Sequence, residues 1–199
     1  MDTERRIALI TLSELGYKIL LRIKKVYPDA DIYISKRLLV SMKRNDLDLQ
    51  SKNLIVYQRG IIDLFKSIFN RYKAFICVMP IGVVFRAISG LINSKYSDPA
   101  IVVIDIGGRW VIPVLSGHEG RANNVAEKTA LCLNSNIIIT TSSEARKNLI
   151  VGIGMRKGVS RDVIAKAIRL AMEKIGEKEE NIRLISTVEK KKEDRGLLE

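Results

Sequence analysis

The chain has 199 residues, of which 47% are hydrophobic and 28% are charged, a composition typical of a soluble globular protein with one large or two small domains. Its longest apolar runs are far too short to span a bilayer, and the acidic residues before the first run argue against a secretory signal, so no membrane association is expected. Two cysteines without metal-ligand spacing, Cys77 and Cys132, are expected to be buried, reduced thiols of a cytoplasmic protein.

The formal net charge of +12 raises the question of nucleic-acid binding. The charge is spread over the chain, with +7 in residues 1–74, +2 in residues 75–147 and +3 in residues 148–199. Aromatic residues make up only 6%, and no basic stripe interleaved with aromatic residues is present. We therefore expect no nucleic-acid partner, and a polyanionic small molecule would benefit equally from a basic surface.

The first half of the chain alternates apolar runs with amphipathic segments. Residues 5–12 are predicted to be a strand, and the spacing of apolar residues after them predicts a helix that Ser13 caps and Pro28 ends. Residues 30–35 alternate as a second strand, whereas residues 36–53 show little periodicity and are expected to form a mobile connection. Three further predicted elements are an amphipathic helix over 60–72, a strand over 74–80 and a helix over 81–92.

The second half continues this alternation. Residues 100–105 are predicted to be a strand, which Gly107 and Gly108 turn into a hairpin with residues 109–115. The remaining predicted elements are a helix over 123–133, a strand over 136–141, a linker over 142–148, a strand over 149–154, a helix over 161–175 and, within 180–199, one more short strand and a charged end. The pattern predicts an α/β fold: a three-layer, mostly parallel sheet flanked by helices, followed by a second, incomplete α/β segment.

Three loops lead from a predicted strand into a predicted helix. They are MPIGVVFRA at 79–87, LSGHEGRAN at 115–123 and GIGMRKGVS at 152–160. In open α/β sheets, ligands gather at the carboxyl ends of strands, where such loops enter helices. These loops are therefore the places where we expect chemistry.

The loop at 115–123 concentrates polar groups at the entrance of a helix. Its polar residues include Ser116, His118, Glu119 and Asn123, and its glycines let the backbone turn sharply and approach a ligand. His118 is the only histidine in the chain, and an imidazole ordinarily titrates near pH 6.5, so His118 is a candidate proton donor or acceptor. The alternative is that Ser116 or Asn123 caps the helix and that His118 is an exposed loop residue.

The loop at 152–160 resembles a nucleotide-binding turn only superficially. Gly152, Gly154 and Gly158 form G-x-G-x-x-x-G, one residue longer than the dinucleotide fingerprint, and no acidic residue follows at the required place. A glycine-rich turn at a helix N-terminus still presents backbone N–H groups to an anion. We expect either an anionic ligand group here or a tight turn with a structural role.

Several blocks in the order found here are similar to one known family. They are FICVMPIGVVFRAISGLI, the SDPAIVVID block, VLSGHEGRANNVAEKTA with the following IIITTSS, GIGMRKGVSRDVIAKAI and KKEDRGLLE. Together they resemble the CbiG family of cobalamin biosynthesis, the cobalt-precorrin-5A hydrolases. Residues 1–145 resemble its amino-terminal domain, and residues 146–199 resemble the beginning of its carboxyl-terminal domain, with Lys191, Asp194, Gly196 and Leu197 matching the signature of the tail.

The chain departs from the family pattern at a few positions. Arg121 stands where members usually have glycine, Ile81 precedes Gly82 in place of threonine, and Met155 replaces a cysteine. Met155 argues against a cysteine mechanism in this chain. The middle domain of many members is absent and the last domain stops early, so we expect a fragment or a reduced version of the family.

The resemblance implies a reaction on a cobalt-bound, ring-contracted tetrapyrrole. A lactone on the macrocycle is opened, and the extruded two-carbon unit is released as acetaldehyde to give cobalt-precorrin-5B. Cobalt would arrive inside the substrate, so we expect no cofactor and no metal site in the protein. Such chemistry needs a group that activates water, donors for an oxyanion and cations for the carboxylate side chains.

We assign these roles from residue chemistry within the marked loops. His118 with Glu119 is the predicted acid/base, and the N–H groups around Gly117 and Gly120 are the predicted donors. The predicted carboxylate anchors are Arg86, Arg109 and Arg121, because a guanidinium matches a carboxylate. The other predicted substrate-binding residues are Gly82, Asp105, Ser116, Asn123, Gly152 and Gly154.

Two alternatives to an enzyme are left open. The early stop and Met155 are compatible with a non-catalytic protein that binds corrinoid intermediates. The basic N-terminal third is compatible with a nucleotide- or RNA-binding module, which salt-resistant, sequence-dependent binding would reveal. A homo-oligomer is also left open.

Overall fold

The chain forms two compact units, residues 1–139 and residues 140–199. The computed structural model describes residues 7–42, 53–117, 120–142, 147–191 and 193–198. His118 and Glu119 therefore lie outside the described residues. Among the described helices, none is both long enough and apolar enough to cross a membrane.

The first unit is built on a seven-stranded sheet with the order β3-β2-β1-β4-β5-β6-β7. The strands are β1 (Ile7–Thr11), β2 (Asp31–Ser35), β3 (Leu54–Tyr57), β4 (Ala74–Val78), β5 (Ala100–Ile104), β6 (Trp110–Leu115) and β7 (Asn136–Ile137). The first five are mutually parallel, whereas β6 runs antiparallel to β5 and β7 runs parallel to β6. The last two strands therefore point the opposite way from the rest of the sheet.

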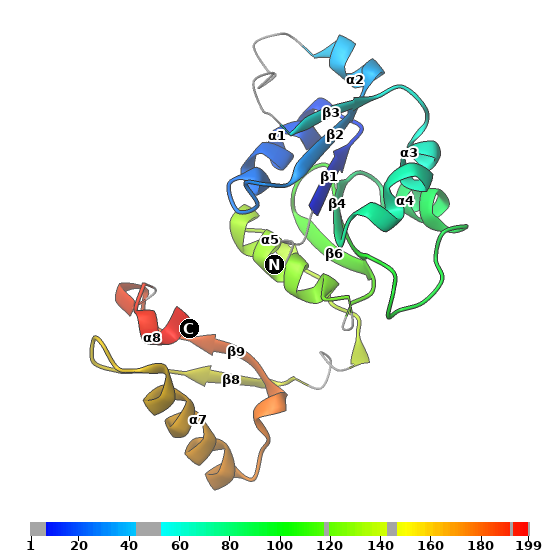
Figure 1. Cartoon of the computed structure of the whole chain (residues 1–199). Coiled ribbons are helices and arrows are strands. Elements are labelled where there is room, and N and C mark those ends of the chain that lie inside the picture. The colour runs from blue at the N-terminus through cyan, green and yellow to red at the C-terminus, as the bar shows by residue number, and fades with distance from the viewer. Residues whose placement is uncertain (1–6, 43–52, 118–119, 143–146, 192, 199) are drawn as a thin grey trace. The chain divides into compact units, whose positions relative to one another are not determined.

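Helices cover both faces of this sheet and create three layers (Figure 1). One face carries α1 (Glu14–Lys24) and α5 (Ala122–Leu133), and the other carries α3 (Ile61–Ile68) and α4 (Ile81–Ile88). Alternate residues of β1 enter the two cores, with Leu9 on the α1 side and Ile10 on the α3 side. All five residues of both β4 and β5 are buried, which is why their sequences are continuously apolar.

The connection after β2 is more ordered than its weak periodicity indicated. Residues Lys36–Ser41 form α2, and the Ser35 side chain accepts a hydrogen bond from the Leu38 N–H at 3.1 Å. The expected mobile connection is therefore wrong for these residues, because this serine caps a short helix. Edge strand β3 was also not predicted, while residues 43–52 lie outside the described part of the chain.

Two smaller expectations are also corrected. The strand predicted over 136–141 is only the two-residue β7, because its pairing with β6 is limited to Trp110 and Val111. Both cysteines are free, but only Cys77 is buried. Cys132 lies partly exposed on α5, where its Sγ contacts the Arg22 carbonyl oxygen at 3.5 Å.

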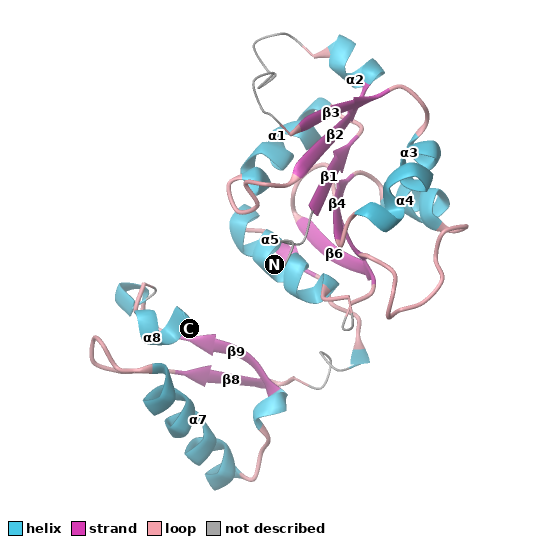
Figure 2. Ribbon diagram, viewed as in Figure 1, coloured by secondary structure: helices cyan, strands magenta, loops and turns pink. Residues whose placement is uncertain are grey.

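The second unit is small and has little interior. Its sheet is a parallel pair, β8 (Leu149–Gly152) and β9 (Ile182–Ser186), connected through α7 (Arg161–Ile175) (Figure 2). The 3-10 turns η3 (Glu179–Asn181) and η4 (Glu189–Lys191) and the short helix α8 (Arg195–Leu198) complete it. Ile164 and Met172 are its only buried hydrophobic residues among those described. The predicted fold class, a mostly parallel three-layer α/β sheet followed by a smaller α/β segment, is confirmed.

Candidate functional site

The antiparallel strand β6 divides the predicted site residues of the first unit between opposite edges of the sheet. Leu115, the last residue of β6, pairs with Ile101 near the start of β5, whereas Val111 pairs with Ile104 at its end. The loop after Leu115 therefore lies at the amino-terminal edge of the parallel strands. The 79–87 loop follows β4 at the carboxyl edge, so these two loops lie at opposite edges of the sheet, because β6 reverses direction.

The carboxyl edge carries two of the predicted anchors, Arg86 and Arg109, together with Gly82 and Asp105. Arg86 lies one turn into α4 and folds back over its start, with its guanidinium 3.5 Å from the position that a Cβ on Gly82 would take. Beside it, the Phe85 side chain is 46% exposed. This edge thus combines an arginine with apolar surface at the point where β4 ends.

Asp105 organises the turn between β5 and β6. Its carboxylate accepts hydrogen bonds from the backbone N–H groups of Arg109 and Trp110, each at 2.7 Å, and from that of Gly107 at 3.1 Å. The Arg109 side chain adds an ion pair at 3.3 Å. Burial alone would raise the pKa of Asp105, but these hydrogen bonds outweigh it and lower that pKa below its ordinary value. A structural role accounts for Asp105, and its predicted role toward substrate stays a prediction.

The amino edge holds the loop that brackets His118 and Glu119. Ser116 and Arg121 both adopt the left-handed conformation, with φ of 55° and 64°, which is uncommon for residues other than glycine. The carbonyl oxygens of Ser116 and Gly117 accept hydrogen bonds from the first two N–H groups of α5, at 3.1 and 3.0 Å. A Cβ at Gly120 would overlap the Ser116 side chain, so only glycine fits there. The ends of this loop are thus fixed tightly against α5.

Arg121 is also the residue at which the family resemblance predicted glycine. It is the N-cap of α5, and its φ of 64° and ψ of 26° are the values that glycine adopts without steric cost. Backbone conformation therefore explains the glycine of the family pattern. The arginine retained here adds a guanidinium at the same place.

Three buried polar side chains lie around this loop. Among the described residues, the buried polar side chains are Thr11, Asp98, Ser116, Asn123 and Thr129, of which Thr11 ends β1 at the opposite edge and Thr129 lies within α5. The Ser116 hydroxyl donates to the Asp98 carbonyl oxygen at 3.0 Å, and the Asp98 carboxylate accepts from the Asn93 N–H at 2.9 and 3.2 Å. Burying polar groups costs free energy unless hydrogen bonds compensate, and Asp98 and Ser116 make such bonds beside this loop.

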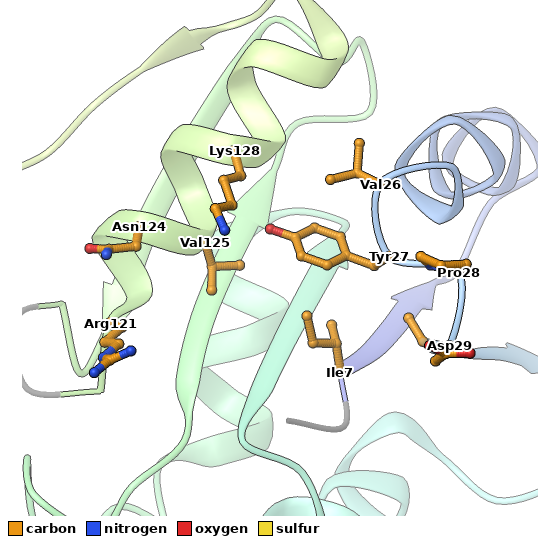
Figure 3. Close-up of a pocket in the computed structure, with 10 residues that line it drawn as sticks. Ile7, Val26, Tyr27, Pro28, Asp29, Arg121, Asn124, Val125 and Lys128 are labelled. Atoms are coloured by element: carbon orange, nitrogen blue, oxygen red, sulfur yellow. The ribbon is translucent and has the colours of Figure 1, made fainter. Parts of the chain in front are cut away.

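A cavity of about 370 Å³ opens beside the loop (Figure 3). Arg121, Asn124 and Lys128 line it from α5, and the 26–30 turn after α1 and Ile7 line it from the other side. Figure 3 shows the Tyr27 ring and the Lys128 side chain pointing toward one another from these facing elements. Burial raises the pKa of the Tyr27 phenol, so the hydroxyl keeps its proton at neutral pH.

Sequence reasoning missed Tyr27, Asn124 and Lys128. About one hundred residues separate the 26–30 turn from Lys128, and only the pairing of α1 with α5 on one face brings them together. The one usable signal was position, since Asn124 and Lys128 lie in the first and second turns of the helix that follows His118 in the sequence. That signal does not reveal the facing tyrosine.

In the second unit, the 153–160 loop lies over a cavity of about 400 Å³ between β8 and α7. The lining is almost wholly apolar and includes Gly152, Gly154 and Met155. The tail fastens this loop, because the Asp194 carboxylate accepts from the Gly158 N–H at 3.2 Å. A Cβ at Gly196 would overlap the Val159 carbonyl oxygen. These contacts give the aspartate and glycine of the tail signature a structural role.

Comparison with known proteins agrees with the pattern of motifs. The sequence model described as "Cobalamin synthesis G N-terminal" matches residues 63–144, and the model described as "Cobalamin synthesis G C-terminus" matches residues 149–199. A solved structure of a cobalamin biosynthesis protein G homolog from Sulfolobus solfataricus is 21% identical, with a TM-score of 0.47, over 94% of this chain and 76% of that one.

Two curated relatives are both named cobalt-precorrin-5A hydrolase. The protein of Priestia megaterium is 32% identical over 152 residues, which are 76% of this chain and 39% of that protein. The protein of Salmonella typhimurium is 35% identical over 99 residues, which are 50% of this chain and 28% of that protein. The present chain thus spans well under half the length of either relative. Its two segments match the N-terminal and the C-terminal models of one family, in that order. The chain therefore belongs to the cobalamin synthesis G (CbiG) family.

Proposed function

We propose that this chain is a cobalt-precorrin-5A hydrolase, which opens the lactone of its tetrapyrrole substrate and releases acetaldehyde to give cobalt-precorrin-5B. The names of the curated relatives support the reaction class. The observation that carries the assignment to a site is the pair of strained residues Ser116 and Arg121, with the buried polar side chains near them, on either side of the only histidine in the sequence. Strained, over-determined backbone of this kind concentrates at functional sites.

His118, with Glu119 beside it, supplies the acid/base function in this proposal. Water adds to the acyl carbon of the lactone as its proton passes to the base, and the ring C–O bond breaks with return of a proton to the freed hydroxyl. Removal of that hydroxyl proton then lets the adjoining C–C bond break. Acetaldehyde leaves, and the electron pair remains on the macrocycle. Cobalt takes part as a component of the substrate, so the proposal includes no protein cofactor.

The oxyanion donors must be N–H groups that the loop has not already used. The N–H groups of Ala122 and Asn123 donate to Ser116 and Gly117 carbonyl oxygens, so they are occupied within the loop. The N–H groups at Gly117 and Gly120 remain the proposed donors. Ser116 and Asn123 are proposed to hold the loop in shape from below, since both are buried.

Arg121 is the proposed carboxylate anchor at this site. Its side chain is exposed at the start of α5 and lines the cavity beside the loop. Arg86 and Arg109 lie at the opposite edge, and a five-residue strand separates the edges by about 16 Å. In this proposal they do not hold the same arm of the substrate as Arg121. The roles first predicted for Gly82, Gly152 and Gly154 also remain proposals.

The direct test is to incubate the purified chain with cobalt-precorrin-5A and measure acetaldehyde and the bound pigment. The expected result is stoichiometric acetaldehyde and conversion of the pigment. Retention of the pigment with no acetaldehyde would instead support a non-catalytic corrinoid-binding protein. Binding to RNA that survives moderate salt, with no affinity for the pigment, would overturn both readings.

A further inference from the structure

The cavity beside Arg121 is shaped for a narrow group with a charged end. Its volume of about 370 Å³ lies at the small end of the range for ligand pockets and suits one arm of a macrocycle. Ile7, Val26 and Val125 supply apolar walls, whereas Arg121 and Lys128 supply positive charge. Apolar walls with a cationic end match a short methylene chain that carries a carboxylate.

Two polar side chains in the cavity have hydrogen-bonding capacity to offer. The Tyr27 hydroxyl is buried and makes no well-aligned hydrogen bond with the described residues, although the Thr129 side chain lies near enough to interact with it. The Lys128 ammonium points toward the same space and forms no ion pair with another described residue (Figure 3). A buried hydroxyl without a partner carries a free-energy cost, which an accepting ligand would remove.

One acidic residue, Asp29, opposes this charge from the far side of the cavity. Asp29 also interacts with the Lys24 ammonium. Burial lowers the pKa of Lys24, and the negative charges of Asp31 and Asp29 partly offset this effect. The lining therefore keeps a net positive formal charge from Arg121 and Lys128 against Asp29. The cavity therefore favours an anionic group, and the negative charge of Asp29 weakens the binding of that group.

We propose that this cavity binds one carboxylate-bearing side arm of the tetrapyrrole. The Tyr27 hydroxyl and the Lys128 ammonium donate to the carboxylate, and Arg121 flanks the cavity at the start of α5. The inference rests on the proposed hydrolase function and extends it to a specificity-determining subsite. It also gives a role to Arg121, the N-cap of α5, and to Lys128 in the second turn of that helix. With one arm held here, the macrocycle extends toward that loop.

The test uses the full chain and two probes, cobalt-precorrin-5A for turnover and uroporphyrin, a stable tetrapyrrole polycarboxylate, for binding by fluorescence. Tyr27→Phe should raise the Kd for uroporphyrin about tenfold with little loss of stability, because the hydroxyl makes no well-aligned hydrogen bond in the free protein. Lys128→Gln should raise it about fivefold, since the ammonium is largely exposed. Asp29→Asn should lower it. With cobalt-precorrin-5A as substrate, Tyr27→Phe and Lys128→Gln should each raise KM and leave kcat nearly unchanged.

The controls are Tyr57→Phe, which removes another buried hydroxyl without a described partner, and Lys66→Gln on the opposite face of the sheet. Both should bind uroporphyrin like the wild type. The methyl ester of uroporphyrin should bind weakly and equally to all variants, because it presents no carboxylate.

The outcomes separate the two proposals. If the wild type turns over the lactone while Tyr27→Phe and Lys128→Gln keep its KM and its Kd for uroporphyrin, the subsite is refuted and the function stands. If the wild type binds neither probe and releases no acetaldehyde, the proposed function fails and the subsite fails with it.

Discussion

Arg121 combines an unfavourable backbone conformation with an exposed positive charge. A left-handed conformation costs a non-glycine residue roughly 1–2 kcal/mol, and such a cost persists only where the surrounding structure imposes it. Two contacts next to Arg121 impose its conformation. The Ser116 carbonyl oxygen accepts a hydrogen bond from the Ala122 N–H of α5, and Gly120 packs closely against the Ser116 side chain. Arg121 therefore lowers the stability of the folded protein but places a guanidinium at the edge of the cavity.

Replacing Arg121 with glycine should separate these two effects. Arg121→Gly should raise the free energy of unfolding by about 0.5 kcal/mol, because relief of the left-handed strain slightly exceeds the entropy cost of glycine. Urea titration measures this change, and tetrapyrrole binding should weaken in the same variant. Arg86→Gly, inside α4, is the control and should lower stability by about 1 kcal/mol. A loss of stability in Arg121→Gly would show that its side chain stabilises the loop.

Among the elements, the β5–β6 hairpin has the largest effect on the site. It reverses the direction of β6 and so carries the His118 loop from the carboxyl edge to the amino edge. Gly108, with φ of 67°, and the four hydrogen bonds of the Asp105 carboxylate build its turn. The glycine pair allowed a hairpin to be predicted. The hairpin also places the 115–123 loop at the amino edge of the sheet, and this position follows only from the strand order.

The turn should give stability a measurable pH dependence. The pKa of Asp105 is lowered in the folded protein, so the unfolded chain binds its proton first as pH falls. The stabilisation is thus complete above about pH 4 and is lost as pH drops through the folded-state pKa. Asp105→Asn should cost about 1 kcal/mol at pH 7 and much less near pH 3, measured by urea unfolding.

Asp63→Asn provides the matched control for Asp105. Asp63 is an exposed acid in the first turn of α3, and its loss should change stability by less than about 0.5 kcal/mol at pH 7. An Asp105→Asn difference that stays constant between pH 7 and pH 3 would mean that the charge of this carboxylate does not support the turn.

Most elements could be predicted from the sequence because the spacing of apolar residues reflects which side chains are buried. The continuous apolar runs of β4 and β5 and the helical spacing of α1 and α7 follow directly from their neighbours in the fold. Elements with weak burial were missed, as α2 and β3 show, since a half-exposed edge leaves little periodicity. The cavity was missed for another reason: Tyr27 and Lys128 meet only through tertiary packing.

At the scale of the whole molecule, the two units differ sharply in how much they bury. The first unit has two hydrophobic clusters, one on each face of its sheet. The second buries only Ile164 and Met172 among its described hydrophobic residues, while Ile150 and Leu184 are more than half exposed. Two-stranded sheets with little core are marginally stable. The predicted domain limits and a homo-oligomer stay predictions.

This contrast should appear in amide hydrogen exchange. We expect the amides of β1, β4 and β5 to exchange only through global unfolding, and those of β8 and α7 to exchange at least a hundredfold faster through local opening. Mass spectrometry on peptides from each unit measures both in one sample. Equal protection of the two units would indicate that the second is stabilised by contacts that its own core does not supply.

The central claim is that the loop around His118 performs the chemistry on a tetrapyrrole held at the amino edge. Acetaldehyde release by His118→Ala, compared with the wild type on cobalt-precorrin-5A, tests it most directly. The expected result is a fall in kcat of at least a hundredfold, with a change in the dissociation constant of the pigment below about threefold. An undiminished kcat in this variant would contradict this role of His118 and favour catalytic residues at the carboxyl edge, where Arg86 and Arg109 lie.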